Sequence, residues 1–179
     1  SGATLEADEA CTVTVDFTPA SSGDFTGTLE IPSNLPTVTV SVSGTGTPMP
    51  VGNAVVTDSV TPFTDNQIPF GSVTQNLSVT HTVTVTNSGN ANLTLGRVAM
   101  ANPLVPPFSI GTDTCSNQVL APTGTCSFEV LFGPTATGAF NDVLDVPSDD
   151  SDLPTVAVSV TGTGTPVPVG EISVADSVS

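Results

Sequence analysis

The sequence lacks tryptophan, tyrosine and lysine, and it has one basic side chain, Arg97, and one histidine, His81. Against 17 acidic residues this leaves a net charge of −16. Nucleic acid is excluded as a partner because Lys and Arg carry phosphate binding, and an anionic membrane surface is disfavoured for the same reason. The missing Trp and Tyr argue against a carbohydrate-binding module, since such modules stack sugars on those rings.

Long apolar runs are also missing. No segment approaches the ~18 residues of a membrane span, and Ser1 does not open a charged and then apolar signal peptide. We therefore expect no direct insertion into a membrane.

Catalytic groups are scarce. A Ser/His/Asp triad would have to use His81, and general acid–base groups are few. A strand histidine that caps the core or faces a neighbour is the better interpretation of His81. G-T-G-T leads into proline rather than into a helix, so it is no phosphate-binding loop. We predict that the chain is not an enzyme and holds no cofactor.

What the sequence does contain is typical of an all-β protein. It has 26 Val and 29 Thr, which favour strands, and 16 Gly and 16 Pro, which punctuate them. No helical period is visible.

An internal repeat organises the chain. The segment from Cys11 to Gly52 returns from Cys126 to Gly170, with an offset of 115 that becomes 118 after a three-residue insertion. The sequence VGNAVVTDSV at 51–60 also returns as VGEISVADSV at 169–178. Self-similarity of this kind is the mark of a repeat architecture.

The repeat predicts three parts. Residues 1–48 are the C-terminal half of one repeat, residues 49–165 are a complete repeat, and residues 166–179 are the first strand of a following one. The two end parts lack counterparts of residues 62–115, so identical chains cannot complete each other head to tail. We expect an excerpt from a longer tandem array, with the apolar side chains of both end parts uncovered within one chain (Val13, Val15, Phe17 and Leu29; Ile172 and Val174).

Short alternating segments predict the strands of the complete repeat. Residues 78–87 place Val and His81 on one face and Thr on the other, as expected for a strand with one buried face. Further strands are expected at 53–60, 68–74 and 92–100, and along the apolar rows that begin at Cys126, Phe140 and Val156. In the first repeat the same rows begin at Cys11, Phe25 and Val38. The predicted fold is an immunoglobulin-like β-sandwich of seven to eight strands, and nine side chains are expected to share its core: Val79, Val83, Val85, Phe128, Val130, Phe140, Leu144, Val156 and Val158.

Three motifs in this pattern resemble a known family. They are the T-N-x-G-N-x-x-L turn at 86–93, the C…L…G-x-C-x-x-x-V-x-F-x-P run at 115–134 and the closing G-T-G at 162–164. The chain resembles the abnormal-spindle/hydin-type Ig-like domain, and more closely its bacterial form in choice-of-anchor D surface proteins, with repeats of about 115–118 residues. This resemblance implies secreted or surface-attached architectural modules in tandem, with no catalytic residues to carry over.

The cysteines are predicted to form a disulfide. Cys115 and Cys126 bracket a short loop, and the repeat offset puts the partner of Cys11 one residue upstream of Ser1. Closing a loop of about 12 residues contributes roughly 3 kcal/mol, and a disulfide implies an oxidising compartment. The alternative is a pair of buried thiols in a cytosolic protein. Zinc is not expected, because the ligands are too few.

One loop gathers acids, namely Asp149, Asp150 and Asp152, with Asp145 just before it. Calcium favours clustered carboxylates, but the matching loop at Ser33 has no acid and the spacing is not that of an EF-hand. We favour a solvated acidic loop and keep the three aspartates as a calcium candidate.

Two classes of function remain. The first is a structural segment of an extracellular or cell-surface array, a fibre, stalk or adhesin of bacterial type, whose partners are neighbouring repeats or like subunits. Its T-P-x-P-V-G joints restrict bending, and its charge keeps the array hydrated. The second is a module that binds a protein ligand, or an accessory domain of a larger secreted protein.

Overall fold

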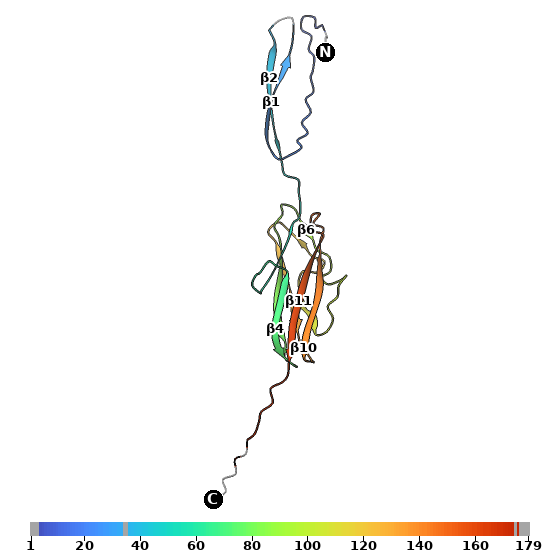
Figure 1. Ribbon diagram of the computed structural model, residues 1–179. Coiled ribbons are helices and arrows are strands. Elements are labelled where there is room, and N and C mark those ends of the chain that lie inside the picture. The colour runs from blue at the N-terminus through green and yellow to red at the C-terminus, as the bar shows by residue number, and fades with distance from the viewer. Residues whose placement is uncertain (1–3, 34–35, 174, 176–179) are drawn as a thin grey trace. The chain divides into compact units, whose positions relative to one another are not determined.

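The computed structural model describes residues 4–33, 36–173 and 175, and every regular element in them is a β-strand (Figure 1). Two compact units divide the chain, Ser1–Met49 and Pro50–Ser179. Among the described residues, no helix is long and apolar enough to cross a membrane.

The second unit is a β-sandwich. One sheet has the order β3-β5-β9-β7, the other has the order β10-β11-β4, and β6 pairs with β8 in a small third sheet. Neighbouring strands are antiparallel except for β11 and β4, which run parallel. Within its described residues the unit has nine strands, of which β6 and β8 have only two residues each: β3 (Ala54–Asp58), β4 (Gln67–Thr74), β5 (Val79–Asn87), β6 (Leu93–Thr94), β7 (Phe108–Asp113), β8 (Val119–Leu120), β9 (Thr125–Phe132), β10 (Gly138–Pro147) and β11 (Thr155–Thr165).

The predicted core is confirmed. Seven of its nine members are buried, and Val79 and Phe140 are partly buried and pack against the same cluster. Strand β5 alternates in the predicted phase, with Val83 and Val85 fully buried beneath an outer row of Thr. The inner faces of the two sheets therefore enclose one hydrophobic core, as in other sandwiches.

The strand predicted at 92–100 is wrong in its length. Only Leu93–Thr94 forms a strand, followed by an isolated bridge at Leu95. The chain then turns, because Gly96 packs against the Pro147 ring and Ala99 adopts a φ of 53°. A left-handed residue cannot continue a strand.

The described residues of the first unit, 4–33 and 36–49, contain one hairpin, β1 (Gly23–Ile31) with β2 (Val38–Gly46). The register of this hairpin repeats that of β10 and β11. Gly23 faces Gly46 as Gly138 faces Gly164, and the residues between follow at the repeat offsets. Gly23 and Gly138 also share a positive φ, 128° and 126°. The two hairpins thus have the same local structure.

The segment predicted as a strand from Cys11 to Phe17 forms none. Its counterpart β9 is held on both sides, by β5 and β7, and counterparts of those two strands do not occur in residues 1–49. A strand needs partners for its backbone groups, which is the physical reason for the difference.

At the other end, residues 166–173 form no strand, and Val169 and Ile172 are exposed. Val174 and residues 176–179 lie outside the described residues, as does Ser1. The assignment of 1–48, 49–165 and 166–179 to three repeats stays a prediction.

Candidate functional site: a disulfide turn and an open hydrophobic face

Cys115 and Cys126 form a disulfide, as their spacing predicts, with their Cα atoms 5.1 Å apart. A turn after β7 places Cys115: the Asp113 carboxylate accepts hydrogen bonds from the Cys115 amide at 2.8 Å and the Ser116 amide at 3.1 Å. Both cysteines are buried in the core. The bond therefore joins the segment that follows β7 to the start of β9 inside the sandwich.

Asp113 is ionised when it accepts these hydrogen bonds in the turn after β7. Burial acts to raise the pKa of its carboxyl, but hydrogen bonds from the Ser116 hydroxyl and the two amides outweigh burial. Arg97 adds a favourable charge. The pKa of Asp113 thus lies below its ordinary value, and the carboxylate holds the turn at neutral pH.

Asp149 and Asp152 are exposed in the acidic loop, but Asp150 is buried, with only 3% of its surface exposed, so the solvated loop that the sequence predicts does not include Asp150. Its Oδ2 accepts a hydrogen bond from the Ala54 amide at 2.9 Å, and its Oδ1 accepts from the Asp152 and Leu153 amides. The Ala54 bond, with those two, holds the pKa of Asp150 below its ordinary value. The carboxylate ties the β10–β11 loop to the first strand of the sandwich.

This arrangement leaves little of the loop for a cation. Asp149 is engaged as well, accepting from the Thr94 amide at 2.8 Å. Within residues 4–33, 36–173 and 175, no group of three or more His, Cys, Asp or Glu is placed to hold a metal ion. The structure uses Asp149 and Asp150 as backbone acceptors.

His81 lies on the inner phase of β5, where its ring packs on Phe70 with centroids 4.8 Å apart. Its Nδ1 lies 3.1 Å from the Ser59 hydroxyl, which also accepts a hydrogen bond from the Thr82 amide. Asp58 accepts from the Val60 amide, and burial raises the pKa of its carboxyl. These contacts fit the core-capping interpretation of His81.

Asn87 is a buried residue whose role the sequence analysis missed. Its Nδ2 donates to the carbonyls of Ala91 and Leu120, and its Oδ1 accepts from the Asn53 and Gly89 amides. One side chain thus joins the turn after β5, strand β8 and the segment that precedes β3. The T-N-x-G-N pattern was the available signal, although it was interpreted only as a turn.

The first unit exposes a hydrophobic face that its counterpart buries. Val15 and Phe17 are 53% and 49% exposed, whereas Val130 and Phe132, 115 positions later, are fully buried. Val13, Phe25 and Val40 are exposed as well. The open face of the first unit is defined here by five exposed residues: Val13, Val15, Phe17, Phe25 and Val40.

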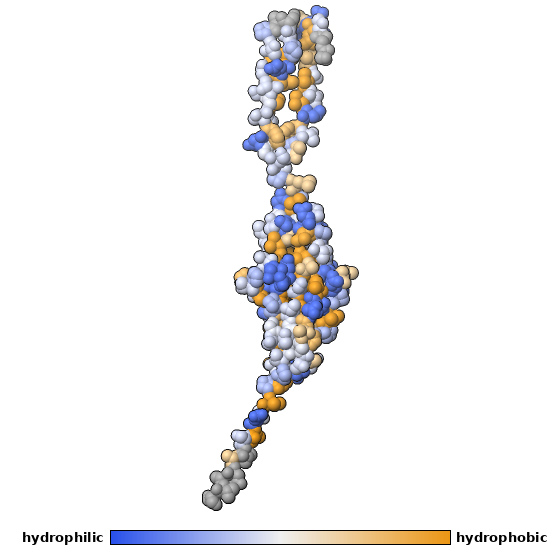
Figure 2. All heavy atoms as spheres, viewed as in Figure 1, coloured by the Kyte–Doolittle hydropathy of each residue, from blue (hydrophilic) through white to orange (hydrophobic). Residues whose placement is uncertain are grey.

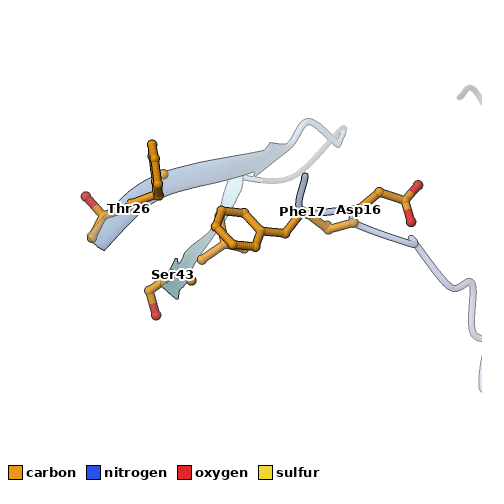
Figure 3. Close-up of a pocket in the computed structure, with 9 residues that line it drawn as sticks. Asp16, Phe17, Thr26 and Ser43 are labelled. Carbon is orange, nitrogen blue, oxygen red and sulfur yellow. The ribbon is translucent and has the colours of Figure 1, made fainter. Parts of the chain in front are cut away.

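The open face borders a cavity of about 430 Å³ between residues 15–17 and the β1–β2 hairpin. Figure 3 shows Phe17 pointing at the hairpin while Asp16 points away from it. In Figure 2, hydrophobic side chains of the first unit gather beside the gap between these two segments. The cavity therefore lies where a complete sandwich has its core.

The fold and its family agree. Residues 60–163 match the HYDIN/CFA65/VesB-like, Ig-like domain family, and since this is more than half of the chain, the chain belongs to that family. The hydin-type resemblance is thereby confirmed, whereas the choice-of-anchor D form is not distinguished. No curated protein matches the chain.

Solved structures share the fold at low identity. A protein of unknown function from Porphyromonas gingivalis W83 has a TM-score of 0.51 and 14% identity, over 80% of this chain and 67% of that one. The Vibrio cholerae VesB protease has a TM-score of 0.49 and 18% identity, over 61% of this chain and 32% of VesB. The PapD-like domain 7 of human CEP192 has a TM-score of 0.47 and 12% identity, over 69% of this chain and 92% of that one. The chain spans about a third of the length of VesB.

Proposed function

We propose that this chain is a structural, non-enzymatic segment of an extracellular or cell-surface array of tandem Ig-like repeats. The observation that carries the proposal is the second copy of the β10–β11 hairpin. It has the same register, and the same glycine faces the same ring: a Cβ on Gly44 would meet Phe17 at 2.9 Å, as one on Gly162 would meet Phe132 at 2.5 Å.

Three further features support a load-bearing role outside the cell. The buried disulfide is typical of an oxidising compartment. The joint TPMPVG between the two units carries two prolines, whose fixed φ limits bending. The net charge of −16 keeps neighbouring arrays apart.

Surface labelling of the native source tests the location. Intact cells are treated with a membrane-impermeant carboxyl-directed reagent, because the chain has 17 acidic residues and no lysine, and with protease. The protein is then followed with an antibody against residues 50–165. We expect the protein to be labelled or cleaved in intact cells, and Cys115 and Cys126 to be joined by a disulfide. A protein that is protected in intact cells and has both thiols reduced contradicts the proposal.

An accessory domain of a larger secreted protein is the second candidate, because the matching family is named in part after VesB, a Vibrio cholerae protease. Mass spectrometry of the intact protein captured by the same antibody separates the two. Peptides from further repeats support the array, and peptides from a catalytic domain support the accessory role.

A further inference from the structure

We infer that the open face of the first unit is a docking surface for one kind of polypeptide, a segment from a further repeat with the strand pattern of residues 50–115. This inference rests on the proposed tandem array. The inference identifies the partner of the first unit and the contacts that join the first unit to that partner.

The second unit shows what covers the equivalent face. Strand β9, the counterpart of residues 10–17, lies between β5 and β7. Strand β11, the counterpart of β2, pairs in parallel with β4. All three covering strands come from residues 67–113. In the first unit, residues 10–17 form no strand, and among residues 4–33 and 36–49 β2 pairs only with β1. The occupant must therefore supply three strands.

The aromatic contacts define the occupant further. Phe132 stacks on Phe108 with ring centroids 4.8 Å apart and contacts Phe70 at 5.5 Å and Phe140 at 6.0 Å. Phe17 reproduces the last contact, meeting Phe25 at 5.7 Å. Residues 50–115 hold the other two rings. An occupant of the same type would place two aromatic rings against the exposed side of Phe17.

Residues 50–115 of the same molecule are poorly placed to be this occupant. In the second unit Asp150 binds the Ala54 amide, so β3 begins at the end of the sandwich where β11 begins. The equivalent end of β2 is Val38, about 26 Å from Gly46 at ~3.3 Å per residue. The eight residue steps from Gly46 to Ala54 span about 26–29 Å when fully extended. This length is used up in reaching the far end of β2, so no residues remain for the turn that would reverse the chain.

Cys11 gives the docking a chemical signature. Its counterpart Cys126 is bonded to Cys115, the last residue of the covering segment, and Cys11 itself is a free, exposed thiol. A docked segment of the same type brings its own terminal cysteine to Cys11.

The test uses the full 179-residue chain and a probe polypeptide of residues 50–115 whose Cys115 carries thionitrobenzoate as a mixed disulfide. The Cys11 thiolate attacks the Cys115 sulfur, an S–S bond forms between them, and thionitrobenzoate leaves with the electron pair of the broken bond. Release of its colour gives the rate, and peptide mapping gives the site. The reference reagent is free cysteine carrying the same leaving group.

We expect the probe to react at Cys11 at least tenfold faster than the reference reagent. V15D, which places a charge on the open face, should lower the probe rate at least tenfold, while T14D, its neighbour on the opposite face, leaves it unchanged. V40D and T39D repeat the comparison on β2 in case V15D disturbs the segment itself. The small reagent should react equally with all four variants.

Equal rates for probe and reference reagent overturn the inference, as do equal probe rates for V15D and T14D together with equal rates for V40D and T39D. Either result leaves the proposed function standing if surface labelling succeeds. A protected, fully reduced native protein would instead remove the proposed function while the docking chemistry could still be measured.

Discussion

At the scale of single residues, Asn87 and Gly89 explain why the turn after β5 needs these residue types. The Asn87 amide is fully buried and makes four hydrogen bonds, two as donor and two as acceptor. A Cβ on Gly89 would collide with the carbonyl oxygen of Val51. The turn therefore combines a side chain that satisfies buried backbone groups with a position that admits no side chain.

Replacing Asn87 with Ala should lower the free energy of unfolding by about 3 kcal/mol or more, because it leaves several buried backbone groups without partners, each worth about 1–3 kcal/mol. Urea unfolding followed by circular dichroism measures the change. N141A, an amide truncation at an exposed position of β10, is the matched control and should change stability by less than about 0.5 kcal/mol. Equal effects of the two substitutions would show that the Asn87 contacts carry no special weight.

At the scale of elements, the repeated hairpin allows the same substitution to be made in two settings. Gly162 faces Phe132, a ring locked in the core by neighbours on both sheets. Gly44 faces Phe17, a half-exposed ring. The strand register is shared, whereas the freedom of the ring to move differs.

G162A should destabilise the second unit by about 1–3 kcal/mol, the usual range for forcing extra atoms into a packed core. G44A should leave the melting of that unit unchanged, because Phe17 can move aside into solvent. Differential scanning calorimetry of both variants makes the comparison. A G162A protein that melts like the parent would mean that Phe132 has room the structure does not show.

The Asp150 carboxylate fixes the β10–β11 loop to β3, and we therefore expect the stability of the second unit to depend on pH. The folded-state pKa of Asp150 lies below its ordinary value of 3.8, so its contribution is complete above that value and is lost as the pH falls through the lower folded pKa. D150N should lower stability at pH 7 and flatten the acid limb of the stability profile. D152N, in the same loop but exposed, should leave both unchanged. The midpoint of urea unfolding, measured from pH 7 to pH 2, reports the result.

The success of prediction from sequence differed between elements for physical reasons. Strand β5 was predictable because its alternation is uninterrupted over nine residues. Strand β7 was missed because prolines precede it and Gly111 and Thr112 interrupt its apolar pattern. The task of Asp150 was hidden because its partner Ala54 lies 96 residues away, and local patterns carry no information on such contacts. The disulfide was predictable because Cys115 and Cys126 are only 11 positions apart and bracket a short loop.

At the scale of the whole molecule, the two units should respond differently to force. The second unit closes a core between two sheets, and its parallel β4–β11 pair links segments that are far apart in the sequence. Its disulfide closes a short loop. The part of the first unit that the structure describes has one hairpin and an exposed apolar face. We therefore expect the second unit to be the mechanically resistant part of the isolated chain.

Pulling on the two ends of single molecules should give one major unfolding peak, from the second unit. With the disulfide intact, the 11 residue steps between Cys115 and Cys126 stay closed at a Cα separation of 5.1 Å. Reduction frees them, so the length gained at the peak should increase by about 35 Å at ~3.6 Å per residue. C11S, which leaves that bond untouched, should show the same increase on reduction, whereas C115S/C126S should show the longer gain without reductant. Two peaks of similar force in the parent would mean that the first unit resists load on its own, and its open face would then need no partner to become stable.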